Sequence, residues 1–205
     1  MAARCPWTVR GVDPVPRRLI LASASPRRRE LLSQLGYPFD VQVAAVIENE
    51  DPTTDPREMV SHNAALKSRW VSDRVPEAVV LGADTTVFLD GHALNKPGSP
   101  SEARAMLRRL SGRTHQVFTG VSVNCIETNL HLDAGAVSEV TFRVLDEPVI
   151  DLYLSKVHVF DKAGGYAVQE HGDLIVASFS GELSTIVGLP LSLTKQLLTR
   201  AGLLA

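Results

Sequence analysis

The sequence predicts an α/β fold in which helices cover a β-sheet, and three observations support this prediction. From Arg18 onward, short β-rich runs alternate with helical patterns of about 10 to 18 residues. The 205 residues are 44% hydrophobic and 21% charged, the balance of an ordinary globular domain. The sequence contains neither an internal repeat nor a low-complexity segment. We therefore predict one domain over residues 17–205, preceded by a flexible extension over residues 1–16.

The first expected elements are a buried strand and the helix that follows it. Residues 18–23 (RLILAS) are apolar enough for a buried strand. Ser25 then supplies a capping hydroxyl, and Pro26 stands at the first helical position, a combination typical of a helix start. Gly36 is expected to end this helix.

Two further helices share one start pattern, and a strand lies between them. The pattern is a capping side chain, a proline and a glutamate that can bond back to the cap, and it occurs at residues 55–58 and 99–102. Residues 78–84 (AVVLGAD) predict a buried strand that ends in a carboxylate, followed by a hairpin with an Asp-Gly turn. Asp84 is therefore expected where a strand leaves the core.

After Gly112 the sequence becomes richer in strand patterns. A helix is predicted near residues 147–156, and a closing helix after Pro190. The predicted strands lie near residues 115–126, 136–144, 166–169, 174–179 and 185–187.

Charge and composition exclude several classes of partner. A net charge of -2 gives no field that would attract a polyanion such as DNA. The apolar runs fall short of the roughly 18 to 20 residues of a membrane-spanning helix, and residues 1–16 lack the apolar core of a secretory signal. Cys5 and Cys125 show no zinc-site or disulfide-framework spacing. We predict a cytoplasmic protein with a small anionic partner, and neither nucleic acid nor membrane binding.

Residues 23–32 (SASPRRRELL) form the first candidate site. They place two serines and three arginines at a strand-to-helix junction, where free backbone N–H groups and the helix dipole favour an anion. This pattern predicts phosphate or carboxylate binding. A solvated row of arginines is the alternative.

Asp84 is the candidate for chemistry, because the ends of strands are where α/β folds place ligands. A turn cap is the alternative role. An aspartyl-phosphate enzyme would need a second aspartate two positions later, where Thr86 stands, so a base or metal ligand is favoured over a nucleophile. Glu48 is the other acidic residue near a strand-like run, and Mg²⁺ or Mn²⁺ needs one or two carboxylates plus substrate oxygens.

Three more polar residues are candidates, although each alone is compatible with an ordinary surface position. Lys67 lies four residues after Asn63 on one helix face, and Lys96 follows the hairpin. The amide of Gln169 donates and accepts, which matches the 4-oxo and N3–H groups of uracil or thymine. The sequence carries no GxxxxGK[ST], GxGxxG, GxSxG or HExxH motif, so several familiar nucleotide-binding and hydrolase classes are excluded.

Taken in order, six segments resemble the Maf family of nucleoside triphosphate pyrophosphatases, from about Leu19 to Leu198. The segments are LASASPRRRELLSQLGYPF, LGADTTV, NKP, EARAMLRRLSGRTHQVFTGV, DKAGGYAVQ and IVGLPL. The resemblance implies an elongated, two-lobed fold of the Maf and ITPase type, with a central mixed sheet and a substrate cleft. It also implies a divalent metal cofactor (Mg²⁺ or Mn²⁺) and hydrolysis of a nucleoside triphosphate to the monophosphate and pyrophosphate.

The resemblance further implies roles for individual residues. Asp84 matches the proton acceptor that activates water, while Arg27, Thr85 and Gln169 resemble the specificity positions of the branch that hydrolyses dTTP and UTP. The other matched positions are polar cleft residues: Ser23, Arg28, Glu48, Lys67 and Lys96. The basic residues, with Arg27 among them, are expected on the phosphates, and Glu48 with Asp84 on the metal.

The sequence departs from the family pattern at three places. Residues 156–160 replace the usual glycine and glutamate, Glu170 stands where glycine is usual, and Thr185 where asparagine is usual. Two alternatives therefore stay open: the same reaction on another nucleotide such as 7-methyl-GTP, and a nucleotide-binding regulator of cell division with little turnover. A homodimer stays open as well.

Overall fold

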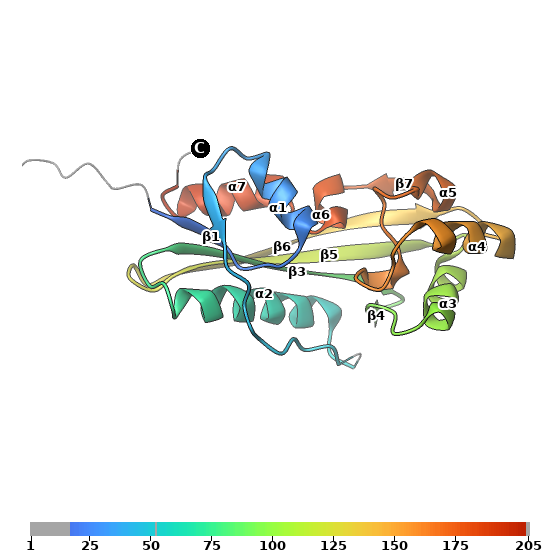
Figure 1. Ribbon diagram of the computed structural model, residues 1–205, viewed down its shortest axis with the longest axis horizontal. Coiled ribbons are helices and arrows are strands. Elements are labelled where there is room, and N and C mark those ends of the chain that lie inside the picture. The colour runs from blue at the N-terminus through green and yellow to red at the C-terminus, as the bar shows by residue number, and fades with distance from the viewer. Residues whose placement is uncertain (1–16, 52, 204–205) are drawn as a thin grey trace, which may run out of the picture.

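The computed structural model describes residues 17–51 and 53–203, and in it a mixed β-sheet forms the spine of an elongated molecule (Figure 1). Seven strands form this sheet in the order β2-β1-β3-β5-β6-β7, with β4 paired to β3. The predicted α/β fold, a mixed sheet flanked by helices, is confirmed. The predicted extension over residues 1–16 lies outside the described residues.

The strands of the described residues all belong to this one sheet. The elements along the chain are β1 (Leu19–Leu21), α1 (Pro26–Ser33), β2 (Phe39–Val41), α2 (Pro56–Ser72), β3 (Val79–Leu89), β4 (His92–Leu94), α3 (Pro100–Leu110), β5 (Thr114–Cys125), β6 (Leu130–Phe142), α4 (Glu147–Lys156), the 3-10 turn η1 (Ala163–Gly165), α5 (Gly172–Ile175), β7 (Val176–Ser180), α6 (Leu183–Val187) and α7 (Leu191–Arg200). Strand β1 pairs in parallel with β2 and β3, and the other pairs are antiparallel.

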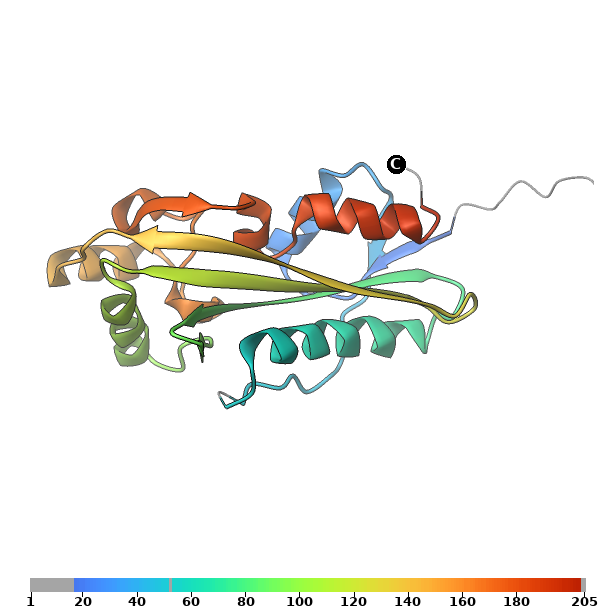
Figure 2. The same cartoon turned by 180° about the vertical axis from the view of Figure 1, so that it is seen from behind.

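The two largest of the hydrophobic core clusters lie in two lobes of the molecule. The long strands β3, β5 and β6 run through both lobes, while α2 covers one face of the sheet and α7 the other (Figures 1 and 2). The first lobe packs β1, α1 and α7 around buried residues such as Leu21, Leu32 and Leu198. The second lobe packs α3 and α4 around Leu107 and Tyr153. The described residues include no helix with the length and apolarity needed to cross a membrane.

The helix starts predicted from capping patterns are confirmed. The Ser25 hydroxyl accepts a hydrogen bond from the backbone N–H of Arg28, and Asp55 and Ser99 cap α2 and α3 in the same way. One detail differs, because Glu102 accepts from the N–H of Gly98, one residue before the cap. The Ser99 hydroxyl accepts from the backbone N–H of Glu102 in the first turn of the helix, while the Glu102 carboxylate holds the turn before the cap.

The prediction that a strand ends at Asp84 is wrong, since β3 continues to Leu89. Its pairing with β5 is unbroken from Val80 to Phe88 and keeps the strand extended. On its other edge β3 pairs with β1 only as far as Leu81 and with β4 only from Val87. Asp84 therefore lies within a strand, at an interval where one edge of that strand is open.

Two of the strands predicted in the last third of the chain are wrong, and a third is shorter. Residues 166–169 follow η1 in an irregular segment, because Gly164 and Gly165 have φ of 71° and 70° and turn the chain sharply. Residues 185–187 belong to helix α6, and residues 174–175 to α5 before β7 begins. Apolar runs this short do not distinguish strand from helix by periodicity. The predicted closing helix is confirmed as α7.

The buried imidazole of His115 is expected to make stability depend on pH. Its ring packs edge-on against Phe142 and Tyr166, only 2% of the residue is exposed, and burial lowers the pKa of His115 to about 4. An unfolded histidine titrates near pH 6.5, so between these values the unfolded chain binds a proton that the folded protein does not. The free energy of unfolding should therefore fall as pH drops from about 6.5 to 4, by up to about 1.4 kcal/mol per pH unit from this group.

Urea unfolding of His115→Gln between pH 7 and pH 4.5 tests this expectation. The variant should lose that part of the pH dependence, whereas the exposed His62→Gln control should keep it. Equal pH slopes in the His115→Gln protein and the wild type would contradict the assignment.

Candidate active site

A cleft of about 470 Å³ lies between the start of α1 in the first lobe and residues 161–169 of the second, over the open edge of β3. Every site residue expected from the sequence lines this cleft: Ser23, Arg27, Arg28, Glu48, Lys67, Asp84, Thr85, Lys96 and Gln169. Residues up to 146 positions apart in the chain, from Ser23 to Gln169, thus meet at one site. The structure thus brings the expected residues together in one cleft, and their roles stay predictions.

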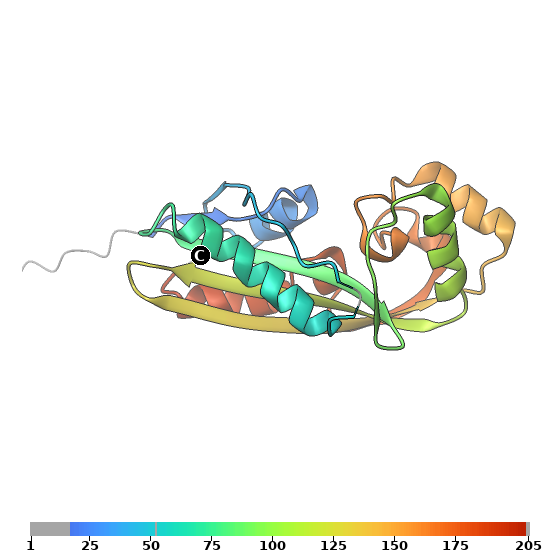
Figure 3. The ribbon, with the colours of Figure 1, turned by 90° about the horizontal axis from the view of Figure 1, so that it is seen from below.

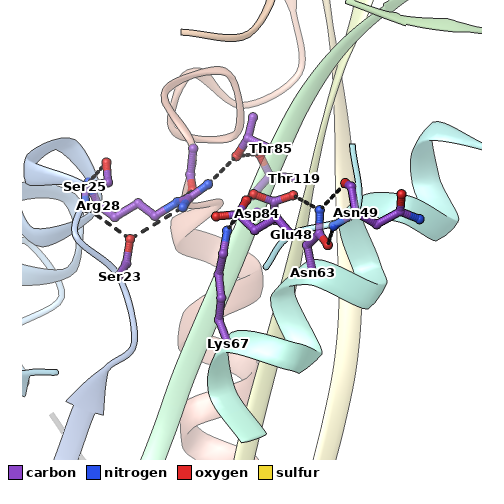
Figure 4. A network of polar contacts seen from close by, with 11 residues as sticks. Ser23, Ser25, Arg28, Glu48, Asn49, Asn63, Lys67, Asp84, Thr85 and Thr119 are labelled. Carbon is purple, nitrogen blue, oxygen red and sulfur yellow. Dashed lines mark hydrogen bonds and ion pairs between the residues drawn. The ribbon is translucent and has the colours of Figure 1, made fainter. Parts of the chain in front are cut away.

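Asp84 is held by two side chains from α2 (Figure 4). Lys67 Nζ lies 2.9 Å from Asp84 Oδ1, and Asn63 Nδ2 donates to Asp84 Oδ2 at 3.1 Å. Lys67 Nζ also contacts Glu48 Oε2 at 2.8 Å, so one ammonium group lies between two carboxylates. Sequence reasoning expected Lys67 on the phosphates, and the structure adds this second set of partners.

The second contact of Asn63 anchors the segment that carries Glu48. Asn63 Oδ1 accepts from the backbone N–H of Asn49 at 2.8 Å, and its Nδ2 donates to the Asn49 carbonyl at 2.9 Å. Glu48 directly precedes Asn49. The amide of Asn63 therefore positions the carboxylate of Glu48 through the backbone and orients the carboxylate of Asp84 directly. Asn63 is 2% exposed, so its amide is held rigidly.

A glycine allows α2 to approach β3 closely enough for these contacts. A Cβ atom on Gly82 would overlap the carbonyl oxygen of Ala64 and come within 2.8 Å of the Ser68 nitrogen. Both are backbone atoms of α2, one helical turn apart. The absence of a side chain at residue 82 therefore brings Asn63 and Lys67 within reach of Asp84.

Arg28 ties three segments together at the first-lobe side of the cleft. Its Nε donates to the Gly188 carbonyl at 2.8 Å, and its Nη2 donates to Thr85 Oγ1 at 2.9 Å. Nη1 lies 3.5 Å from Ser23 Oγ. Burial lowers the pKa of Arg28, while the charges of Asp84 and Glu48 oppose that effect, and an arginine in proteins stays protonated at neutral pH. The guanidinium is thus a fixed positive charge beside Asp84.

Arg27 reaches across the cleft to the second lobe. Its Nη1 forms an ion pair of 3.1 Å with Asp161 Oδ2, and Lys162 Nζ lies 2.8 Å from Asp161 Oδ1. Burial acts to raise the pKa of Asp161, but Lys162 and Arg27 outweigh it, so the pKa lies below its ordinary value. Asp161 therefore compensates part of the positive charge of Arg27, which the sequence analysis assigned to a ligand.

Lys96 and Gln169 face the cleft from its second-lobe side and are both exposed. Within residues 17–51 and 53–203, neither side chain forms a hydrogen bond or an ion pair. The neighbouring Asn95 carbonyl accepts from the N–H of Gly164 at 3.2 Å, which joins the loop of Lys96 to η1. Both side chains are therefore available to a ligand.

Comparison with known proteins assigns the chain to a family. The model of the family described as "Maf-like protein" matches residues 18–201. The chain belongs to the Maf family. A protein of Akkermansia muciniphila named dTTP/UTP pyrophosphatase is 47% identical over 172 residues, which cover 84% of this chain and 90% of that protein. Proteins of the same name from Symbiobacterium thermophilum and Anaeromyxobacter dehalogenans are 46% and 47% identical, over 91% and 90% of this chain and 95% and 94% of their own lengths.

The Ham1 protein of Staphylococcus aureus is among the solved structures that are similar to this Maf chain. The superposition has a TM-score of 0.44 at 15% identity and covers 62% of this chain and 72% of that one. A likeness of this size supports no statement about function.

Sequence reasoning gave no role to three residues that shape this Maf site: Asn63, Thr119 and Asp161. Thr119 Oγ1 lies 2.9 Å from Thr85 Oγ1 and donates to the Thr185 carbonyl at 2.8 Å. These contacts fix Thr85, which is next to Asp84, the candidate general base. Asp161 lies in the segment DKAGGYAVQ, in which sequence reasoning gave a role only to Gln169. The cross-strand register that places Thr119 opposite Thr85 is the missing signal, and a sequence alone does not specify it.

Proposed function

We propose that this chain hydrolyses dTTP and UTP to the nucleoside monophosphate and pyrophosphate. Its relatives of 46 to 47% identity carry the name dTTP/UTP pyrophosphatase, and they match it over most of their length. The observation that carries the proposal is the cleft itself, which joins a held carboxylate, several cations and an amide side chain in one site. The chain is a hydrolase that acts on a phosphoric anhydride bond.

Asp84 is the proposed proton acceptor. Lys67 and Asn63 hold its two oxygens in fixed directions, so a water molecule beside it can be oriented and deprotonated. That water attacks phosphorus, the anhydride bond between the α and β phosphates breaks, and pyrophosphate leaves. Arg28 and the N-terminus of α1 stabilise negative charge on the phosphates, and Arg27, Lys67 and Lys96 are proposed to share this role.

Glu48 and Asp84 are proposed to hold a divalent metal. Both are carboxylates close enough to bond one ammonium nitrogen, and such oxygens suit Mg²⁺ or Mn²⁺ when substrate oxygens complete the shell. No group of three or more His, Cys, Asp and Glu gathers within the described part of the chain. The bound ion would offset charge that develops on the phosphates. When the metal is bound, Lys67 must share its two carboxylate partners with it or lose contact with them.

Removal of divalent metal is expected to abolish hydrolysis. Activity should be lost in excess EDTA and return when Mn²⁺ is added back. In Glu48→Gln the Mn²⁺ concentration for half-maximal activity should rise by about tenfold or more, because about 1.4 kcal/mol corresponds to a factor of ten. The exposed Glu50→Gln, two residues away, is the matched control and should keep the wild-type value. Full activity in EDTA would exclude the metal.

Gln169 is proposed to select the base, together with Arg27 and Thr85. A pyrimidine with a 4-oxo group and an N3–H presents one acceptor and one donor side by side, and a carboxamide pairs with both. Gln169 lines the cleft, and within the described residues its amide has no other partner.

A panel of nucleotides tests the proposed function directly. The purified protein is incubated with Mn²⁺ and dTTP, UTP, CTP, dATP, GTP or 7-methyl-GTP, and the products are separated by chromatography. We expect monophosphate and pyrophosphate in equal amounts, released fastest from dTTP and UTP. Release of single phosphate would refute the reaction type, and preference for 7-methyl-GTP would establish the alternative substrate. Tight binding of every nucleotide without products would favour the regulatory alternative.

A cytoplasmic location and a homodimer stay predictions.

A further inference from the structure

The segment that carries Gln169 has little regular structure to hold it. Residues 166–170 follow η1 and lie outside every helix and strand. The backbone N–H of Glu170 bonds to the Ala167 carbonyl at 3.3 Å, a bond within the segment that attaches it to nothing else. Residues 166–169 nevertheless form one wall of the cleft. An ion pair of 3.3 Å between Lys162 Nζ and Glu170 Oε1 ties the end of the segment, and the backbone before Gln169 needs a further attachment.

The hydroxyl of Tyr153 attaches this segment to helix α4. Tyr153 Oη accepts from the backbone N–H of Ala167 at 2.9 Å and lies 3.3 Å from the Ala167 carbonyl oxygen, to which it donates. One side-chain oxygen thus satisfies both backbone groups of the residue two positions before Gln169. In Figures 1 and 3, α4 and the segment after η1 lie side by side at one end of the molecule.

The surroundings of Tyr153 make this attachment rigid. Its side chain is fully buried in the core of the second lobe, which includes Ile150 and Ile175. Burial raises the pKa of Tyr153 to about 12, so the hydroxyl keeps its proton and can donate at neutral pH. The preceding residue is held as well, because the buried Tyr166 hydroxyl lies 2.7 Å from His115 Nε2. Two adjacent residues of the cleft wall are therefore fixed from behind.

We propose that Tyr153 is a positioning residue for base selection, which sets the place of Gln169 through the backbone of Ala167. The proposal rests on the proposed function, since it takes Gln169 as the residue that contacts the base. A contact made through the backbone is insensitive to the side chain at position 167, and it uses a helix none of whose residues lines the cleft. Without the hydroxyl, the N–H of Ala167 loses its partner, its carbonyl keeps only the N–H of Glu170, and the segment is free to shift.

Tyr153→Phe tests the proposal, because it removes one oxygen and keeps the ring. The KM for dTTP is expected to rise about 3- to 10-fold, and the preference for dTTP over dATP to fall by the same factor, the effect of losing one or two buried hydrogen bonds. Inhibition by inorganic tripolyphosphate, which has no base, should change by less than about twofold. A loss of stability alone would lower kcat equally for every nucleotide and leave the KM values unchanged.

The matched control is Tyr37→Phe, which removes a hydroxyl from a tyrosine that is 5% exposed in the core of the first lobe. It should keep the wild-type KM values and the wild-type preference. The same preference in Tyr153→Phe as in the wild type would overturn the proposal. A wild-type protein without preference for dTTP would instead overturn the proposed function.

Hydrogen exchange in the wild type is the second measurement, and it needs no variant to fold. The Ala167 amide should exchange at least about tenfold more slowly than those of Val168 and Gln169, for which the described residues offer no backbone acceptor. Exchange of all three amides at one rate would overturn the attachment, whatever the protein hydrolyses.

Discussion

Replacing Asp84 by asparagine is expected to lower kcat for dTTP hydrolysis by about 10²- to 10⁴-fold, the usual contribution of a general base. The amide has the shape of the carboxylate and can still accept from Asn63, but it cannot take a proton from water. Lys67 keeps Glu48 as a partner, so its charge stays compensated. Nucleotide binding should therefore survive, and equilibrium dialysis with labelled dTTP should give a Kd near the wild-type value.

Asp90→Asn is the control for this experiment. Asp90 lies in the turn after the same strand and has φ of 54°, a conformation that asparagine adopts readily. Its exposed carboxylate contacts Arg113 and does not line the cleft, so kcat should stay unchanged. If Asp84→Asn kept more than about a tenth of the wild-type kcat, a base role would be refuted. Loss of binding as well as turnover would point to a charge needed for the ligand.

The local features of the fold were the ones that the sequence predicted best. Each correct helix start depends on a side chain and a backbone N–H within three residues of it, as with Ser25 and Arg28. Such contacts are determined by adjacent residues alone. The expected site residues also line one cleft, but that expectation depended on the resemblance to the Maf family and not on contacts between adjacent residues.

The errors concern contacts that depend on distant parts of the chain. The strand through Asp84 continues because β5 pairs with it, and β5 begins 30 residues later. Lys67 lies between two carboxylates because α2 packs on β3, an arrangement set by a glycine whose role no local pattern reveals. In the same way, α6 is a helix although its sequence is rich in β-formers, and tertiary contact overrides that propensity.

That glycine gives the second large expected effect. A methyl group on Gly82 would meet backbone atoms of α2, at Ala64 and Ser68, and not a flexible side chain that could turn away. The helix must then move outward as a unit, and Asn63 and Lys67, which lie on it, must move with it. A displacement of about 1 Å in a catalytic group can cost 10²-fold in rate, and overpacking of a core costs about 1 to 3 kcal/mol.

Gly82→Ala should therefore lower both stability and kcat, although residue 82 touches no ligand. We expect a loss of about 1 to 3 kcal/mol in urea unfolding and a fall in kcat of about 10²-fold for the fraction that remains folded. Gly172→Ala is the matched control, since its Cβ would find its nearest neighbour, Val168 Cγ2, at an ordinary 3.9 Å. It should change neither quantity appreciably. A Gly82→Ala protein with wild-type kcat would show that the contact of α2 with Asp84 is not needed for turnover, and Lys67 would then have to act on the substrate and not on the base.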